Sequence, residues 1–253
     1  MTLAEALGVG RGDSVALVGG GGKSTAMFRL AREVVGTGGR AITTTTTKIF
    51  AGQIALSPSH VPAAKATRAA VMDALDAHGQ VLVIGEADPA SGKADGIPLD
   101  LFASLRAWFP DACMLNEADG SRMLPFKAPA DHEPVIPPAT TLVVPVVGAD
   151  VIGQPLDAEH VHRPERVRAL SGALAGAVVT PEIVARVLAH ADGGCKGVPA
   201  GARVVAMVNK VDTLADRGPA HDTARLLLRD PRIEAVVLAA VRAPQPVLEV
   251  CRR

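Results

Sequence analysis

Cysteine is scarce in this chain, and the three cysteines, at positions 113, 195 and 251, lie far apart. An odd number of widely spaced cysteines makes neither a disulfide framework nor a CxxC metal site. A disulfide-stapled secreted scaffold is therefore excluded, and a reducing cytoplasm is the expected compartment. The seven histidines form no HxxxH pair and no His-rich tract, which argues against a histidine-based metal store.

The chain also lacks an excess of either charge and any long apolar run. Lys and Arg total 26, as do Asp and Glu, so binding of nucleic acid through a broad basic surface is not expected. No uninterrupted apolar segment approaches the roughly 20 residues that span a bilayer. The first residues have no basic start followed by an apolar core, so we expect no signal peptide and no membrane partner.

Apolar, β-branched segments alternate along the chain with segments of helical spacing. The strand-like segments lie at 14–18, 41–47, 81–85, 112–119, 141–148, 203–209 and 233–241. The helix-like segments lie at 24–35, 62–79, 99–109, 180–194 and 223–230. This alternation predicts an α/β three-layer sandwich with a mostly parallel central sheet. We expect one domain over residues 1–253, with a Pro-rich elaboration at about 119–165.

The stretch VGGGGKST, residues 18–25, stands between the first strand-like and the first helix-like segment. A strand, a glycine turn and a helix N-terminus offer backbone N–H groups to phosphate oxygens, which predicts a P-loop NTPase-like fold. The spacing departs from G-x-x-x-x-G-K-[ST], because Leu17 stands where the first glycine belongs. The shortened pattern also resembles the loops of ATP-dependent amide ligases such as the Mur ligases. The predicted phosphate-binding residues are Gly19, Gly20, Gly21, Gly22, Lys23, Ser24 and Thr25.

Two carboxylates follow the fourth strand-like segment, in MLNEADGSR. Glu117 or Asp119 would hold Mg²⁺ together with the Ser24 hydroxyl, as a Walker-B acid does. Lys23, Glu117 and Asp119 are therefore the candidates for catalysis, and the choice of metal ligand between the two acids stays open.

Five consecutive threonines, Thr43 to Thr47, end the second strand-like segment. Open α/β sheets bind ligands at the carboxyl ends of their strands, so the stretch 45–48, and within it Thr45 and Thr46, is the candidate for contact with Mg²⁺ or the terminal phosphate. The alternative is that threonine is there because it favours strands.

The sequence N-K-x-D, formed by Asn209, Lys210 and Asp212, follows the sixth strand-like segment. This is the base-reading motif of GTPases, in which the aspartate accepts hydrogen bonds from guanine N1–H and the 2-amino group. Adenine lacks both donors. The motif favours GTP, whereas the shortened phosphate loop favours ATP.

Several segments together resemble the YqeC family, from about residue 7 to residue 215. They are LVGGGGKST, TTTTTKIF, EADGSRMLPFKAPADHEPVIP, HRPE, GGCKGVPAGARV and NKVD. The resemblance implies a P-loop nucleotide-binding fold. It also implies a role as an accessory protein in maturing the cofactor of selenium-dependent molybdenum hydroxylases, with the hydroxylase or its maturation proteins as partners. Asn116 and Cys195 look like local departures from the family pattern.

Polar residues set among prolines in the segment 117–137 are candidates for contact with a second substrate or a client enzyme, since proline lowers the ordering cost of binding. They are Arg122, Lys127, His132 and Glu133, which His162 and Arg163 could join. A rigid structural loop is the alternative. Three functions stay open: a Mg²⁺-dependent GTPase accessory protein, an ATP-dependent kinase or ligase-like enzyme, and a nucleotide-binding regulator without turnover.

Overall fold

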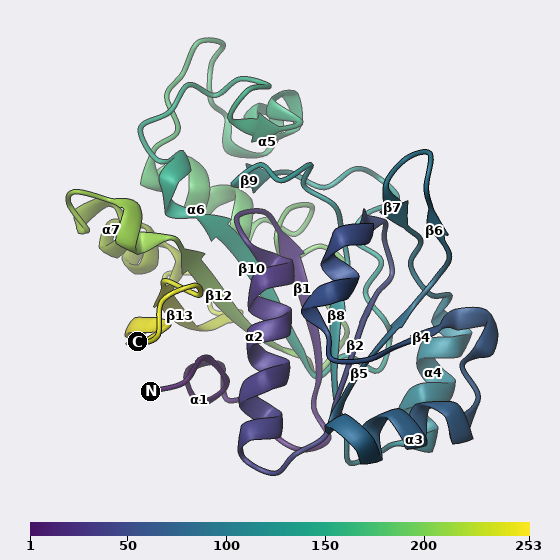
Figure 1. Cartoon of the computed structure of the whole chain (residues 1–253). Helices are drawn as coiled ribbons and strands as arrows, with labels where there is room; N and C mark the ends of the chain where they lie inside the picture. The colour runs from purple at the N-terminus through teal and green to yellow at the C-terminus, as the bar shows by residue number, and fades with distance from the viewer.

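A nine-stranded sheet forms the centre of the protein in a computed structural model that describes residues 1–253 (Figure 1). From edge to edge its strands are β14 (Val247–Arg252), β13 (Ile233–Ala239), β12 (Arg203–Asn209), β10 (Leu142–Gly148), β1 (Ser14–Gly19), β8 (Cys113–Glu117), β2 (Ala41–Thr45), β5 (Gln80–Ile84) and β4 (His60–Pro62). All neighbours pair in parallel except β14, which runs antiparallel to β13 at one edge. The predicted α/β architecture with a mostly parallel sheet is confirmed.

Helices cover both faces of this sheet (Figure 1). They are α1 (Leu3–Leu7), α2 (Lys23–Gly36), α3 (Arg68–His78), α4 (Leu99–Trp108), α5 (Pro164–Ser171), α6 (Pro181–Ala189) and α7 (Gly218–Leu227). Alternate residues of β1 show how the layers divide. Val15 and Leu17 pack in the same core as α1 and α2, whereas Ala16 and Val18 face the opposite side. There α6 and α7 cover one half of the sheet, and α3 and α4 cover the other.

The long apolar strands are buried on both faces, which explains why they read as continuous apolar runs rather than alternating ones. β10, for example, has all seven residues buried. No helix is long and apolar enough to cross a bilayer.

The elements differ from the sequence prediction mainly at their ends. The second strand stops at Thr45, because the chain then turns away into a loop. The segment 62–79 divides into β4, a 3₁₀ turn and α3, which begins where Thr67 caps it by accepting a hydrogen bond from the N–H of Ala70. The short helices α1 and α5 and the edge strand β14 were not predicted.

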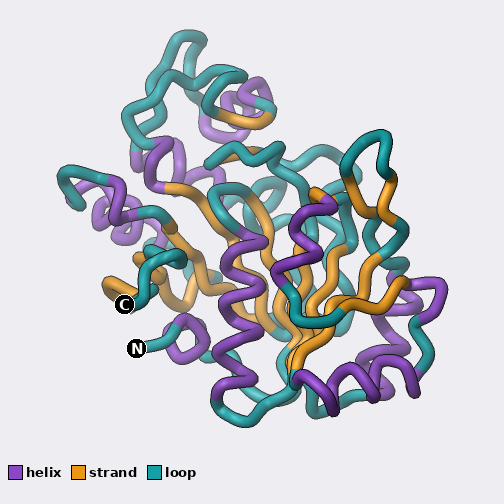
Figure 2. Tube along the Cα trace, viewed as in Figure 1, coloured by secondary structure: helices purple, strands orange, loops and turns teal.

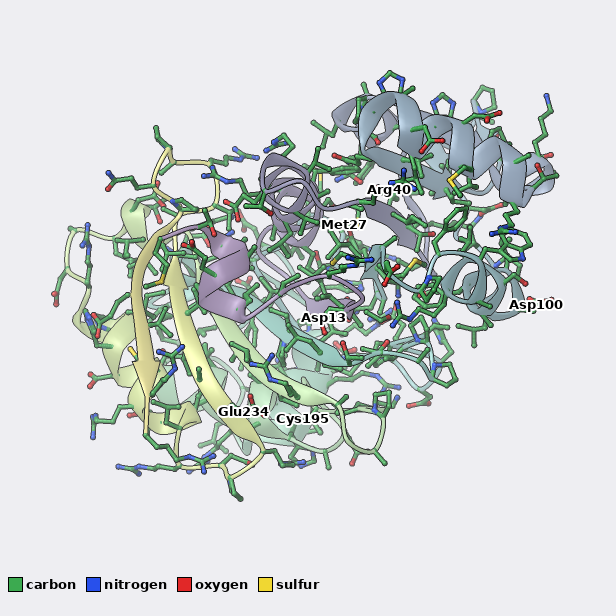
Figure 3. The ribbon with its side chains drawn as sticks, turned by 90° about the horizontal axis from the view of Figure 1, so that it is seen from below. Asp13, Met27, Arg40, Asp100, Cys195 and Glu234 are labelled. Carbon is green, nitrogen blue, oxygen red and sulfur yellow. The ribbon has the colours of Figure 1, made fainter.

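Two small sheets stand beyond the carboxyl ends of the central strands, where Figure 2 shows the longer loops gathered. One pairs β9 (Phe126–Lys127) with β11 (Val161–His162), so that two parts of the Pro-rich region lie side by side. The other joins β3 (Ile49–Phe50), β7 (Lys93–Ala94) and β6 (Ala87–Asp88). The view from below in Figure 3 shows the opposite end, where Asp13, Arg40 and Glu234 mark the starts of β1, β2 and β13.

Candidate functional site

The four glycines between β1 and α2 are held tightly against neighbouring segments. The N–H of Gly20 donates to the Val146 carbonyl at 2.9 Å, and the N–H of Gly21 donates to the Leu124 carbonyl at 3.2 Å. Gly21 has φ 77°, and a Cβ there would collide with the backbone of Gly148. Packing against β10 and the segment 124–126 therefore requires small residues here, whatever the loop binds.

The first turn of α2 leaves backbone donors free. The N–H groups of Gly22, Ser24 and Thr25 donate to no acceptor in the protein. Free N–H groups and the positive end of the helix dipole favour an anion at such a position. The free N–H groups are fewer than the predicted phosphate-binding residues, because Gly19, Gly20 and Gly21 already use their N–H groups within the protein.

Lys23 is buried at the start of α2, with 3% of its surface exposed. Its ammonium donates to the Gly19 carbonyl at 2.6 Å and lies 3.3 Å from Asp119 and 3.5 Å from Glu117. Burial by itself lowers the pKa of Lys23, but the charges of Asp119 and Glu117 outweigh it, and the pKa stands above its usual value. Lys23 is therefore a fixed positive charge beside the free N–H groups.

Glu117 and Asp119 both reach Lys23 but have different further partners. Glu117 accepts a hydrogen bond from the Ser24 hydroxyl at 2.5 Å. Asp119 lies beyond the end of β8, and its two carboxylate oxygens accept the N–H of Gly19 at 3.0 and 3.1 Å. Of the two acids, Glu117 therefore lies beside the Ser24 hydroxyl, and Asp119 holds the glycine loop.

The structure contains no group of three or more His, Cys, Asp or Glu residues that could enclose a metal by itself. The Ser24 hydroxyl and the Glu117 carboxylate offer a hard cation two oxygen ligands side by side. Mg²⁺ commonly takes one or two protein oxygens and completes its shell with water and substrate phosphates. The residues present fit that pattern.

Most hydroxyls of the threonine run form hydrogen bonds with backbone carbonyls rather than facing the cleft. The hydroxyls of Thr43 and Thr44 donate to carbonyls of β5. Thr45 is fully buried and its hydroxyl donates to the Glu117 carbonyl at 2.9 Å, while Thr46 donates to the Val135 carbonyl at 2.6 Å. Of the five, only Thr47 lines the cleft described below.

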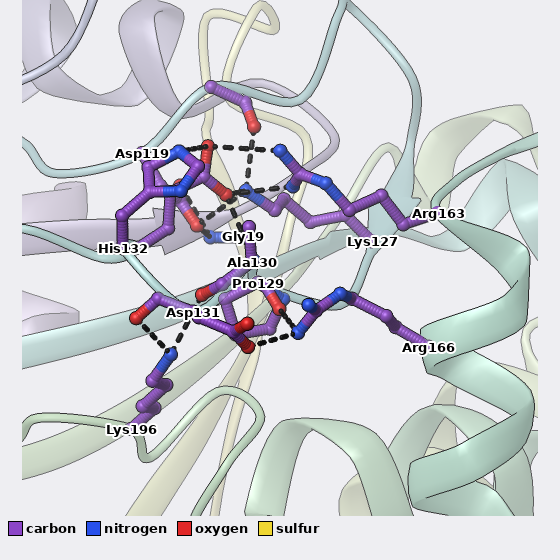
Figure 4. Close-up of polar contacts among 12 residues, drawn as sticks. Gly19, Asp119, Lys127, Pro129, Ala130, Asp131, His132, Arg163, Arg166 and Lys196 are labelled. Carbon is purple, nitrogen blue, oxygen red and sulfur yellow. Dashed lines mark hydrogen bonds and ion pairs between the residues drawn. The ribbon is translucent and has the colours of Figure 1, made fainter.

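A chain of buried ion pairs links the loop to the Pro-rich segment (Figure 4). The Lys127 side chain is completely buried, and its ammonium lies 3.1 Å from Asp119 and 2.6 Å from Glu133. Arg163 donates to both oxygens of Glu133, at 2.8 and 3.3 Å. Burial raises the pKa of Glu133, but its bonds to Arg163 and Lys127 dominate and lower that pKa to about 2. His132, by contrast, is exposed and 4.0 Å from Glu133.

His162 is half-buried next to Arg163, and its imidazole ring forms no hydrogen bond with the protein. Burial, together with the charges of Arg163, Lys127 and Arg122, lowers the pKa of His162 to about 4. Its imidazole is therefore neutral at pH 7, with one ring nitrogen able to accept a hydrogen bond.

These groups surround a cleft of about 670 Å³ at the carboxyl ends of the strands. Its lining includes Gly22, Lys23, Ser24, Thr25, Glu117, Arg122, Glu133, His162, Arg163 and Lys210 from the predicted set, and also Thr47, Lys48, Phe50, Lys93, Met123 and Arg242. Thr47 and Lys48 belong to the stretch 45–48 that the sequence favoured, whereas Phe50, Lys93, Met123 and Arg242 were not among the predicted site residues. Arg242 follows the end of β13, as the predicted residues follow other strands, and that position could have identified it. Nothing in the sequence shows that Phe50 and Lys93 pair across β3 and β7.

Of the N-K-x-D residues, Lys210 lines the cleft, whereas Asn209 and Asp212 do not. Asn209 is buried, and its side-chain amide donates to the Gly21 carbonyl at 2.8 Å while its oxygen accepts the N–H of Val241 at 3.1 Å. The Lys210 ammonium lies 2.7 Å from Asp150, and Asp212 is exposed. Asn209 thus ties the segment both to the glycine loop and to the turn after β13.

Comparison with known proteins identifies relatives of this chain. The family model described as YqeC protein matches residues 15–165, which include the glycine loop, Glu117, Asp119 and the segment that carries Lys127 and Glu133 but not Asn209 to Asp212. The chain is also 30% identical over 197 residues to an uncharacterized protein YqeC from Escherichia coli (strain K12). That similarity covers 78% of this chain and 75% of the relative. The chain belongs to the YqeC family.

Proposed function

We propose that this protein binds a nucleoside triphosphate with Mg²⁺ in the cleft at the N-terminus of α2, that the nucleotide is GTP, and that the protein hydrolyses it. We further propose that it acts as an accessory protein in maturing the cofactor of a selenium-dependent molybdenum hydroxylase. The pathway follows from the family resemblance, and the chemistry follows from the site.

The observation that carries the nucleotide proposal is the convergence of Lys23, Ser24 and Glu117 at free helix N–H groups. Lys23 supplies a charge for the terminal phosphates, and the first turn of α2 supplies N–H donors. Ser24 and Glu117 would hold Mg²⁺, which neutralises charge that develops on the phosphates. Contacts within the protein hold Lys23, Ser24 and Glu117 in these positions, as electrostatic preorganisation requires.

The choice of GTP rests on Asn209, Lys210 and Asp212. Asn209 connects the glycine loop to the Val241 N–H, so the segment stands at a fixed distance from the phosphate site. Lys210 and Arg242 line the same end of the cleft and could lie on the two faces of a base. Asp212 is exposed and free to accept the two guanine donors.

A second candidate function is an ATP-dependent kinase or ligase-like reaction. The observation in its favour is that the cleft continues past the phosphate end toward Phe50 and Lys93, which leaves room for an acceptor molecule.

Glu117→Gln and Asp119→Asn test the proposed chemistry as a matched pair. Glu117→Gln should retain nucleotide affinity but lose Mg²⁺-dependent turnover by about a hundredfold, because the ligand beside Ser24 loses its charge. Asp119→Asn should mainly lower the stability of the fold, since Lys23 and Lys127 lose a buried counter-charge. Phosphate release with and without Mg²⁺, and thermal unfolding of both variants, are the measurements. Normal turnover in Glu117→Gln would refute the metal assignment.

A further inference from the structure

The cleft extends to both sides of the glycine loop. Lys210 follows β12, the loop follows β1, and Thr47 and Lys48 follow β2. In the sheet, β10 separates β12 from β1, and β8 separates β1 from β2. Neighbouring strands are about 4.8 Å apart, so the cleft reaches roughly 10 Å to each side of β1. A nucleotide with its base at Lys210 and its phosphates at α2 occupies only the half between β1 and β12.

The other half of the cleft, between β1 and β2, is also positively charged, and the proposed nucleotide does not extend into it. Lys48, Lys93 and Arg122 all line it. Lys48 is 2.8 Å from Asp95, but Lys93 and Arg122 have no carboxylate within 4 Å. The whole cleft presents seven Lys and Arg side chains against the two glutamates Glu117 and Glu133. Unpaired cations gathered in a concave site attract an anionic ligand.

The same half carries exposed apolar surface. Phe50 is 42% exposed, whereas the other four phenylalanines, Phe28, Phe102, Phe109 and Phe126, are all buried. The Lys93 ammonium lies 5.9 Å from the centre of the Phe50 ring. Met123, which also lines the cleft, is 78% exposed. An exposed ring and a flexible thioether suit a flat, partly apolar molecule.

His162 adds a neutral polar group to the lining of the cleft. Its ring faces the cleft near Arg122 and Arg163 and has no protein partner. Buried or half-buried polar groups normally find a partner, and a donor on a ligand would supply one.

We propose that this half of the cleft, formed by Phe50, Lys93, Arg122 and Met123, binds a second small molecule made of a planar ring that carries an anionic group. The ring lies against Phe50, and the phosphate or carboxylate contacts Arg122 and Lys93. The inference rests on the proposed function, because it assumes that the nucleotide fills the other half. It places the second molecule next to the terminal phosphate.

Phenyl phosphate is a suitable probe because it contains both a planar ring and an anionic group. The protein is first saturated with a non-hydrolysable GTP analogue and Mg²⁺, and phenyl phosphate, benzoate and inorganic phosphate are then titrated by calorimetry. We expect phenyl phosphate or benzoate to bind the loaded protein more tightly than inorganic phosphate does. The comparison of phenyl phosphate with benzoate shows whether the anionic group is a phosphate or a carboxylate.

Substitutions of residues that line the cleft test where the probe binds. Arg122→Gln should weaken its binding by about tenfold or more, and Phe50→Ala by about two- to tenfold. Leu56→Ala and Lys65→Gln are matched controls, since both side chains are exposed on the same stretch of chain but do not line the cleft. Affinity for the GTP analogue should stay unchanged in all four variants.

The inference is overturned if the loaded protein binds neither ring probe, if inorganic phosphate binds as well as they do, or if Arg122→Gln and Phe50→Ala leave probe binding intact. Displacement of the GTP analogue by the probe would also overturn it. These outcomes leave the proposed function standing. Failure of the GTP analogue itself to bind is a separate result, which refutes the proposed function and this inference together.

Discussion

Lys23→Ala is expected to weaken the binding of GTP with Mg²⁺ by about ten- to a hundredfold. Lys23 is the only lysine at the start of α2, and its charge stands beside the free N–H groups. A charge-assisted contact is worth about 1.5–3 kcal/mol, and 1.4 kcal/mol corresponds to about tenfold in affinity. Equilibrium titration with a fluorescent GTP analogue measures the effect.

The same change removes the cation that Glu117 and Asp119 share and leaves Asp119 with Lys127 alone, so folding must be measured alongside binding. Lys23→Arg retains the charge and serves as the conservative variant, and Lys65→Ala removes an exposed lysine outside the cleft. A folded Lys23→Ala protein that binds GTP as tightly as wild type would show that the glycine loop is only a structural turn.

Lys127→Ala is expected to lower the free energy of unfolding by about 3–5 kcal/mol, because it leaves two carboxylates with less compensation in the interior. The Lys127 ammonium is within 3.1 Å of Asp119 and within 2.6 Å of Glu133, and it also donates to the Gly120 carbonyl at 2.7 Å. Asp119 still pairs with Lys23, and Glu133 still pairs with Arg163. The loss of stability is therefore expected toward the lower end of this range. Urea unfolding followed by circular dichroism gives the value.

His132→Ala is the matched control in the same segment. His132 is exposed, so its replacement should change stability by less than about 0.5 kcal/mol. If Lys127→Ala unfolds within about 1 kcal/mol of wild type, the buried ion pairs do not hold the Pro-rich segment against the glycine loop.

Much of the architecture could be predicted from the sequence, because runs of apolar residues separated by helical spacing allow few arrangements. The continuous apolar character of segments such as 141–148 follows from burial on both faces of a parallel sheet. Parallel strands end at one edge, so residues after β1 and β8 had to lie near one another. The sequence grouped Ser24 with Glu117 or Asp119 in one candidate site, and in the structure the Ser24 hydroxyl donates to Glu117. The contacts of Lys23 with both acids were not predicted.

The predictions were less informative where long-range hydrogen bonds decide a side chain's role. The threonine run could equally have faced a ligand, but Thr45 and Thr46 donate to backbone carbonyls that only the folded chain brings within reach. Asp119 accepts the N–H of a residue 100 positions away. Lys127 reads as a surface residue among prolines, yet its side chain is completely buried, and its ammonium contacts Asp119, Gly120 and Glu133.

The measurement that tests the central claim most directly is the equilibrium affinity of wild type and Asp212→Asn for GTP, ATP and xanthosine triphosphate, each with Mg²⁺. Wild type should prefer GTP. In Asp212→Asn the new amide donor faces the guanine 2-amino group, so GTP should weaken by about ten- to a hundredfold. Xanthosine triphosphate, which has a carbonyl at that position, should bind more tightly than before, and ATP should change little. A wild type that binds none of the three would contradict the account, and a wild type that prefers ATP would replace GTP hydrolysis with the kinase or ligase-like reaction.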